Sequence, residues 1–326
     1  MTEKSEAIRR ILVADLGGTY CRFAQFRLDA SGGLRLVCGT RLETVLIRSQ
    51  AELLAALDEA DLGLSVGQAD AVVFAVPGAV VGRRVRFANI PWELDLDAFD
   101  ATFGPDRVTC VNDFLAQALG CRTEAAVKAM DVRPGEWRQD CVQAVIGAGT
   151  GCGMAALLPL PEGGVLPLPS EGGQTAAKFF DPVEQAFAQY LCRLTGERYV
   201  RGDTVLSGSG LAHLHCFLTG EDLDPVAVAA RLTANCRTTE LFARFYGRAV
   251  RDYALTVLAT GGIFISGGVA AKNPDLVLHP EFSREFLGSP TYGDLLASIP
   301  IRLVRNEHTG LFGAARYAAN RLPPLA

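Results

Sequence analysis

The sequence predicts an α/β protein with two domains, and three observations support this. The chain has 326 residues, which at roughly 150 residues per domain favours two domains. Short apolar runs containing β-branched residues alternate with segments of helical periodicity, a pattern typical of α/β folds. A strand–glycine turn–strand pattern also opens each half of the chain, over residues 8–28 and again over residues 141–158.

The composition is that of an ordinary globular chain, with 49% hydrophobic and 21% charged residues. The formal net charge of -5 argues against a nucleic-acid partner, because proteins that bind nucleic acids usually carry a basic surplus. The nine cysteines include no C-x-x-C pair, which favours free thiols in a reducing compartment. The N-terminus is charged, and the two long uncharged stretches are broken by clustered glycines. We therefore expect a cytoplasmic protein with no membrane partner.

The first half begins with an apolar run over residues 8–16, long enough for a buried strand. After Gly17-Gly18-Thr19, apolar and polar residues alternate with period two, so the glycine turn joins two strands as a hairpin. Turn residues, apolar runs and helical spacing predict the later elements in the same way. These are a strand over 34–40, a helix beginning at Ser49, a strand over 71–76, a hairpin over 80–90, a strand over 108–112 and a helix over 114–130.

The second half repeats the opening pattern, with a strand over 141–146, a glycine-rich turn over 147–153 and a strand over 154–158. Apolar residues at helical spacing then predict several helices, and two short apolar runs predict strands. The helices are expected over 182–195, 210–219, 225–235, 239–259 and 310–320, and the strands over 262–266 and 301–304.

Two common nucleotide-binding loops are excluded. No glycine is followed by lysine, so a Walker A loop is absent, and the spacing of the glycines does not fit the Rossmann fingerprint. The glycine turns at Gly17-Gly18-Thr19 and Gly149-Thr150-Gly151 can still present backbone N–H groups to phosphate oxygens. Tight turns alone would explain one such loop equally well, but two of them, one in each half, favour phosphate binding. Asp15, at a strand end, is suited to holding a hydrated Mg²⁺.

Asn112 and Asp113 lie between a predicted strand and a predicted helix, where open α/β sheets place ligands. A carboxylate in that place can act as a general base that accepts a proton from a bound ligand. The alternative is that Asp113 caps the following helix, and an isolated aspartate in that place favours the cap.

Eight motifs lie along nearly the whole chain: ADLGGTYCRFA, FAVPGAVVGRRVRFANIPWELD, VNDFLAQALG, VIGAGTGCGMAALLP, PSEGGQ, VLSGSG, IFISGGVAAKNPDLV and TGLFGAARY. In their order and number they resemble the motifs of the bacterial glucokinases, in the hexokinase–actin–heat-shock-chaperone superfamily. The resemblance implies two ribonuclease-H-like (actin-like ATPase) domains with mixed sheets flanked by helices and an active-site cleft between them. We expect a small domain over 1–123, completed by a C-terminal helix over 306–326, and a large domain over 124–305.

The resemblance also implies the activity and the site. The expected enzyme transfers the γ-phosphoryl group of ATP to the 6-hydroxyl of glucose, with Mg²⁺ held through water by Asp15, and forms a homodimer. Asp113 is the expected base. The residues expected to bind the sugar are Asn89, Asn112, Asp113, Glu171, Gln174 and Asp203. The residues expected to bind the nucleotide are Ala14, Asp15, Leu16, Gly17, Gly18, Thr19, Gly149, Thr150, Gly151, Gly267 and Gly268.

Three residues depart from the family's usual pattern. Gln174 stands where the family usually has histidine, Asp203 where it has glutamate, and Tyr20 where it has asparagine. Because the first two positions would lie near the anomeric carbon, these departures concern sugar preference more than kinase chemistry. A kinase for another hexose, a catalytically weak sugar-sensing regulator and an actin-like or chaperone-like ATPase therefore stay open, as do ADP or polyphosphate as phosphoryl donors.

Overall fold

The computed structural model describes residues 8–87 and 91–323. The chain divides into unit 1, Met1–Val127 with Glu307–Ala326, and unit 2, Lys128–Asn306. Each unit has a sheet with parallel and antiparallel strands and helices packed on it, so the predicted mixed α/β fold class is confirmed.

Unit 1 is built on a five-stranded sheet with the order β3-β2-β1-β4-β7. Its strands are β1 (Arg9–Leu16), β2 (Tyr20–Leu28), β3 (Leu34–Glu43), β4 (Ala71–Val76) and β7 (Val108–Asn112). The first three strands are antiparallel neighbours, whereas β1, β4 and β7 run parallel. The predicted hairpin around Gly17-Gly18-Thr19 is confirmed, and β4 has the predicted bounds. Because β1, β4 and β7 are parallel, their carboxyl ends lie at one edge of the sheet.

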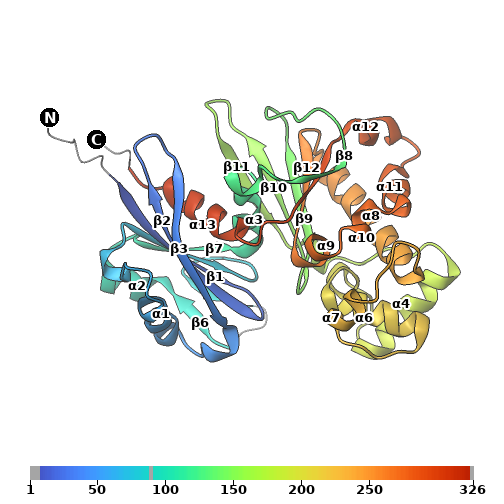
Figure 1. Cartoon of the computed structure of the whole chain (residues 1–326), viewed down its shortest axis with the longest axis horizontal. Coiled ribbons are helices and arrows are strands. Elements are labelled where there is room, and N and C mark those ends of the chain that lie inside the picture. Colours follow the sequence, from blue (N-terminus) through green and yellow to red (C-terminus); the bar gives the residue numbers. More distant parts are fainter. Residues whose placement is uncertain (1–7, 88–90, 324–326) are drawn as a thin grey trace. The chain divides into compact units, whose positions relative to one another are not determined.

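Helices cover the sheet of unit 1. They are α1 (Gln50–Glu59), α2 (Leu96–Phe103), α3 (Asp113–Gly120) and α13 (Thr309–Ala319), with the 3-10 helices η1 (Thr44–Leu46), η2 (Val66–Gln68) and η3 (Glu124–Ala126). The C-terminal α13 packs beside α3 and against the central strands β1 and β4 (Figure 1). On this face the rings of Phe26 and Phe312 lie 5.0 Å apart, edge to face. Ser49 caps α1 by accepting the N–H of Glu52 at 3.1 Å, where the sequence predicts the start of that helix.

Two predictions for unit 1 are wrong in their bounds. The helix expected over 114–130 ends at Gly120, whose carbonyl oxygen accepts the Thr123 hydroxyl at 2.7 Å, and Met130 already begins a strand. The hairpin expected over 80–90 forms later, between β5 (Arg84–Arg86) and β6 (Glu93–Asp95).

The domain boundaries stay a prediction. They differ from the units of the structure in residues 124–127 and 306. Residues 124–127 fall in unit 1 because η3 packs against α3 and α13.

Unit 2 is built on a six-stranded sheet with the order β11-β10-β9-β12-β13-β8. Its strands are β8 (Met130–Arg133), β9 (Gln143–Ala148), β10 (Cys152–Pro159), β11 (Val165–Ser170), β12 (Gly262–Ser266) and β13 (Ile301–Val304). In this sheet β11, β10 and β9 are antiparallel neighbours, whereas β9, β12 and β13 run parallel. These five strands therefore repeat the topology of the unit 1 sheet. The glycine turns after β1 and β9 therefore occupy equivalent places in the two units.

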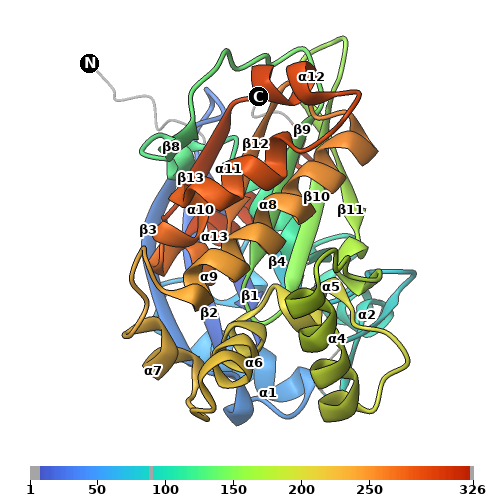
Figure 2. The ribbon, with the colours of Figure 1, turned by 90° about the vertical axis from the view of Figure 1, so that its right-hand side faces the viewer.

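Nine helices are described in unit 2, and the 21-residue α8 is the longest. They are α4 (Pro182–Thr195), α5 (Gly202–Val205), α6 (Gly208–Thr219), α7 (Pro225–Ala229), α8 (Arg237–Val257), α9 (Gly268–Lys272), α10 (Asp275–Leu278), α11 (Pro280–Leu287) and α12 (Gly293–Ser298), with the 3-10 helix η4 (Gly172–Gln174). Helix α8 packs against α10, α11 and β9, in front of the sheet in Figure 2. The helix predicted over 182–195 is confirmed, and the one predicted over 225–235 is shorter than expected.

A buried ion cluster joins three helices of unit 2. The Arg248 guanidinium donates to both carboxylate oxygens of Glu184, at 2.9 and 3.1 Å, and to Glu285 at 3.1 and 3.2 Å. The side chains of Arg248 and Glu184 are only 4% and 1% exposed. Because such charges are stable in the interior only when paired, this cluster depends on every partner being present.

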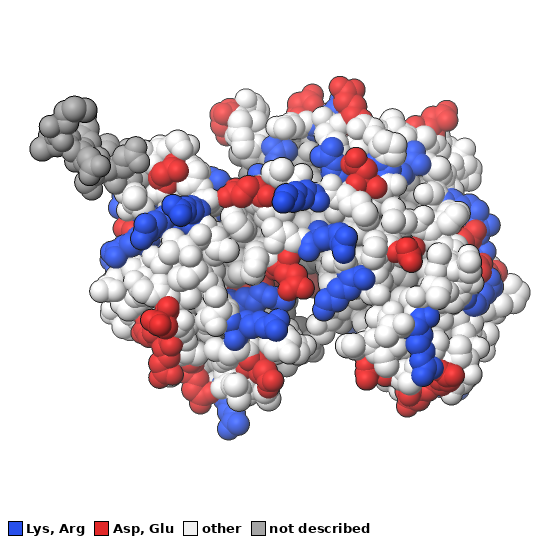
Figure 3. Space-filling model, viewed as in Figure 1, with Lys and Arg blue, Asp and Glu red and all other residues white. Residues whose placement is uncertain are grey.

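Acidic and basic side chains are interspersed on the face drawn in Figure 3, in keeping with the near-balanced charge of the sequence. Within residues 8–87 and 91–323, no helix combines the length and the apolar character that crossing a membrane requires.

Candidate functional site

The first glycine turn, between β1 and β2, is fixed by close contacts. The Gly17 N–H donates to the Tyr20 carbonyl oxygen at 3.0 Å, and a Cβ at Gly17 would lie 2.8 Å from that oxygen. Thr44 holds the turn from the side, donating its N–H to the Thr19 carbonyl at 3.0 Å and its hydroxyl to the Gly17 carbonyl at 2.7 Å. Gly18 and Thr19 are exposed, as a ligand-binding turn requires. The side chains of Ala14 and Leu16 lie in the core, which leaves only their main-chain groups for a ligand.

Asp15 lies at the end of β1, opposite Arg22 of β2, with 3.6 Å between its carboxylate and the guanidinium. Burial raises the pKa of the Asp15 carboxyl above its ordinary value of 3.8, and the neighbouring Arg22 offsets part of this effect. A Cβ at Gly310, at the start of α13, would lie 3.4 Å from Asp15 Oδ2, so no larger side chain separates the carboxylate from that helix end.

The side chains around Asp15 determine how a Mg²⁺ ion would be held there. In the part of the chain that the structure describes, no three His, Cys, Asp or Glu side chains gather closely enough to ligate a metal. Mg²⁺ commonly keeps several waters and takes only one or two carboxylates, so Asp15 alone fits a cation held through water.

Asn112 and Asp113 lie at the carboxyl end of β7, on the sheet edge where β1 also ends. The N-cap of α3 is Asn112, whose Oδ1 accepts the Leu115 N–H at 2.9 Å; Asp113 is the first residue of the helix. Asn112 Nδ2 donates to the carbonyl of Gly78 at 3.0 Å, and Asp113 Oδ1 accepts the N–H of Phe114 at 2.7 Å. The N-cap is therefore Asn112, whereas Asp113 stands at the first helical position and its carboxylate accepts the N–H of the residue that follows it.

Unit 2 brings the second and third glycine loops together, because β9 and β12 are parallel neighbours. The Gly149 N–H donates to the Gly151 carbonyl at 2.8 Å and closes the turn after β9. A Cβ at Gly267 would lie 2.6 Å from the Ala148 carbonyl oxygen, so the loop after β12 touches the end of β9. The hydroxyl of Tyr246 from α8 accepts the N–H of Ala148 at 3.1 Å and supports this edge from behind.

Packing explains some of these glycines and not others. Gly267 has φ +155°, and a Cβ at Gly147 would lie 1.5 Å from the Ser266 carbonyl oxygen, so the fold itself requires both glycines. A Cβ at Gly268 would meet no atom within 4 Å, and one at Gly149 would only reach the Gly151 carbonyl at 4.0 Å. The fold therefore leaves open space at Gly268 and Gly149, as it would where a nucleotide approaches the backbone.

The candidate sugar-binding residues of unit 2 meet around Asp203, in α5. Its Oδ1 accepts the backbone N–H of Cys152, and its Oδ2 accepts Nε2 of Gln174 at 2.7 Å. Glu171 is exposed on the loop that precedes η4, and its pKa is raised by partial burial and then by the negative charge of Asp203. The structure thus gathers Glu171, Gln174 and Asp203 beside the glycine turn that ends at β10.

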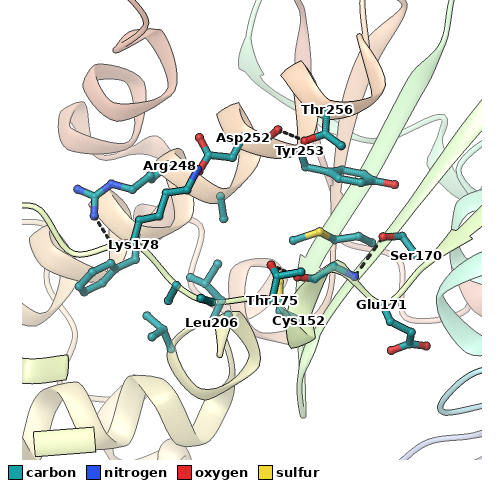
Figure 4. A pocket seen from close by; sticks show the side chains of 18 residues that line it. Cys152, Ser170, Glu171, Thr175, Lys178, Leu206, Arg248, Asp252, Tyr253 and Thr256 are labelled. Carbon is teal, nitrogen blue, oxygen red and sulfur yellow. Dashed lines mark hydrogen bonds and ion pairs between the residues drawn. The ribbon is translucent and has the colours of Figure 1, made fainter. Parts of the chain in front are cut away.

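A pocket of about 480 Å³ lies behind this loop, also within unit 2. Figure 4 shows Cys152, Ser170 and Thr175 on one side of it and the α8 residues on the other, while the Glu171 side chain points away from α8. Lys178 and Asp252 form an ion pair of 2.7 Å in its lining. Glu171 and Gly172 belong to the lining, so the loop forms part of the wall of this pocket.

The candidate residues therefore form two groups, one in each unit, and Asn89 lies outside the described residues. The sequence analysis missed three contributors: Gly78, which fixes Asn112; Thr44, which holds the first glycine turn; and Arg201, which contacts Gln174 at 2.8 Å. Only Gly78 carries a local signal, since Pro77-Gly78 is a turn pair directly after β4.

Residues 12–321 match the glucokinase family. The chain belongs to the glucokinase family. A glucokinase of Stenotrophomonas maltophilia is 31% identical over 333 residues, covering 95% of each chain. A glucokinase of Pseudomonas paraeruginosa is 33% identical over 322 residues, covering 93% of this chain and 90% of the relative. The crystal structure of a glucokinase from an Antarctic psychrotroph is 26% identical, with a TM-score of 0.76, and the match covers 95% of this chain and 99% of that one.

Membership of the glucokinase family confirms the predicted resemblance and the predicted class of enzyme, a sugar kinase. The match spans both units, so the fold of each unit belongs to the family architecture.

Proposed function

We propose that this protein transfers the γ-phosphoryl group of ATP to the 6-hydroxyl of glucose and releases glucose 6-phosphate and ADP. The observation that carries this proposal is that two neighbouring polar residues at the carboxyl end of β7 have different roles. Asn112 caps α3, and the Asp113 carboxylate beside it is not the cap. In a glucokinase-family chain, a carboxylate in that place is suited to take up the proton of the acceptor alcohol.

In this proposal, Asp113 accepts the proton of the 6-hydroxyl as the oxygen forms its bond to the γ-phosphorus. The bond from that phosphorus to the oxygen bridging the β- and γ-phosphates breaks, and ADP carries its electron pair away. An ordinary carboxylate suffices as the base, because the hydroxyl becomes acidic only late in a loose transition state. Asn112 has one amide hydrogen and one oxygen lone pair beyond its two hydrogen bonds, so it can orient a sugar hydroxyl.

ATP binding is assigned to the glycine turns. The open space at Gly149 and Gly268 supports the approach of a nucleotide to the backbone of unit 2, with Thr150 adding a hydroxyl donor. Gly17, Gly18 and Thr19 supply the corresponding turn in unit 1. Mg²⁺, held through water by Asp15, would neutralise charge on the phosphate oxygens. A cytoplasmic location and a homodimer are part of the same proposal.

A coupled assay tests this proposal with the full chain, ATP, Mg²⁺ and glucose. Glucose 6-phosphate is followed through the NADPH that glucose-6-phosphate dehydrogenase produces. We expect turnover with glucose and none with 6-deoxyglucose, which lacks the acceptor oxygen. ATP hydrolysis that is indifferent to every hexose would overturn the proposal and favour an ATPase.

One observation supports a second candidate, a kinase for another hexose. Gln174 and Asp203 bond to each other at 2.7 Å, which uses part of the hydrogen-bonding capacity expected for the hydroxyls near the anomeric carbon. A panel of glucose, mannose, 2-deoxyglucose and N-acetylglucosamine separates the candidates when turnover is followed by ADP release, coupled through pyruvate kinase and lactate dehydrogenase, which reports every acceptor alike. The best acceptor has the highest kcat/KM.

A further inference from the structure

Gln174 lies between two charged groups that require opposite ends of its amide. On one side, Arg201 Nη1 donates to Gln174 Oε1 at 2.8 Å. On the other, Gln174 Nε2 donates to Asp203 Oδ2 at 2.7 Å. A guanidinium can only donate hydrogen bonds and a carboxylate can only accept them, so both neighbours select the same amide orientation. In the flipped orientation, the amide N–H groups would face the Arg201 guanidinium and the amide oxygen would face the Asp203 carboxylate, so neither hydrogen bond could form.

Arg201 is itself held in place. Its Nε and Nη2 donate to the two carboxylate oxygens of Glu197, at 3.1 and 2.8 Å, a two-pronged pair that fixes the plane of the guanidinium. This contact raises the pKa of Arg201, so its charge persists at any working pH. The third nitrogen, Nη1, is thereby directed to Gln174.

The backbone around Gln174 is fixed, but its side chain is not fixed by packing. A Cβ at Gly173 would lie 2.1 Å from the Cys152 carbonyl oxygen, and the Gly202 N–H donates to the Thr175 carbonyl at 2.9 Å. The Gln174 side chain is exposed, and the pocket described above lies behind the loop. Hydrogen bonds are therefore what decides where the amide points.

We propose that Arg201 is a positioning residue for sugar binding: it orients the Gln174 amide, and through it the Asp203 carboxylate, toward the hexose. The inference rests on the proposed function and adds a residue to it. With the amide oriented, one Nε2 hydrogen and one Oε1 lone pair stay available for a sugar hydroxyl, and Asp203 stays tied to the Cys152 N–H of the glycine turn.

Kinetics of two Arg201 variants test this. Arg201→Met removes the donor and keeps the chain length; we expect the hexose KM to rise about tenfold, with the ATP KM and kcat nearly unchanged. Arg201→Lys restores one donor and should recover part of the loss. Arg193→Met, an exposed arginine of α4, is the matched control and should leave both KM values unchanged.

A double variant tests whether Arg201 acts through Gln174. Adding Arg201→Met to Gln174→Leu should raise the hexose KM no further than Gln174→Leu alone. The role would be overturned if the two substitutions raised the hexose KM additively, or if Arg201→Met left the hexose KM unchanged. It would also be overturned if Arg201→Met raised the hexose KM and the ATP KM equally and lysine restored neither. Failure of the proposed function looks different, because the wild-type chain would then phosphorylate no hexose. Calorimetric binding of hexose to the same variants needs no turnover and separates the two failures.

Discussion

Gly147 in β9 and Ser266 in β12 approach so closely that a Cβ at Gly147 would lie 1.5 Å from the Ser266 carbonyl oxygen. Gly268, two residues after Ser266, faces open space instead. These two positions are thus glycine for different physical reasons: Gly147 allows the sheet to pack closely, and Gly268 leaves the backbone accessible.

These two glycines give the first prediction. Gly147→Ala should yield misfolded or strongly destabilised protein, because neither backbone can move away within a paired sheet. Gly268→Ala should keep the wild-type Tm and raise the ATP KM about tenfold or more, since its methyl group would occupy the nucleotide's space. Thermal melts and ATP titrations measure both effects. An unchanged ATP KM in Gly268→Ala would show that no ligand approaches that backbone.

Asp113→Asn should lower kcat by about a thousandfold, in the range expected for loss of a general base. Sugar binding, measured by calorimetry, should persist because the amide keeps the shape and one acceptor oxygen. Asn112→Asp is an informative companion, since a carboxylate still caps α3. Near-normal turnover in Asp113→Asn would remove Asp113 from the role of base.

Asp15→Asn should make the folded state more stable at neutral pH while reducing kinase activity. Burial raises the folded-state pKa of Asp15 above 3.8, so the neutral carboxyl favours folding and the charged one opposes it. The stability that this group contributes is fully present below pH 3.8 and is lost as the pH rises through the folded pKa.

Asparagine stays neutral, so the Tm of Asp15→Asn should exceed that of the wild type by on the order of a few degrees at pH 7. The difference should close toward pH 4. An equal loss of Tm at both pH values would mean that the contact with Arg22 outweighs the cost of burial.

Glu184→Gln should destabilise unit 2 by about 3 kcal/mol, because it leaves part of the buried Arg248 charge without its partner. Urea unfolding measures this loss. The pair of Arg237 and Glu240 in α8, which is much more accessible to solvent, provides the control, and Glu240→Gln should cost about 0.5 kcal/mol or less. Equal effects of the two substitutions would contradict a structural role for the buried cluster.

Local pattern was enough to predict the elements that are buried on both sides. Strands β4, β12 and β13 have the predicted bounds, because continuous apolar runs between turn residues admit few other structures. The helix expected over 114–130 shows a case in which the local sequence pattern does not predict where an element ends. Its apolar residues continue beyond Gly120, but contacts between Gly120 and Thr309, far along the chain, set the packing there.

The candidate site was predictable in part for the same reason. The glycine turns and Asn112-Asp113 are contiguous motifs whose place at strand ends follows from the sequence. The bonds of Asp203 to Cys152 and Gln174 join positions 51 and 29 residues apart, and the role of Arg201 follows only from its contact with Gln174. No spacing in the sequence indicates such contacts.

Helix α13 has a consequence for biosynthesis. Its residues Leu311, Ala314 and Ala315 are buried in unit 1, against strands that begin at Arg9, although all of unit 2 intervenes in the sequence. While the nascent chain leaves the ribosome, the part of the amino-terminal sheet that α13 covers therefore stays exposed until this last helix has been translated. Chaperones that bind exposed apolar surface therefore have more time to bind this unit than unit 2. A premature stop codon shortly before α13 would leave the same surface exposed permanently.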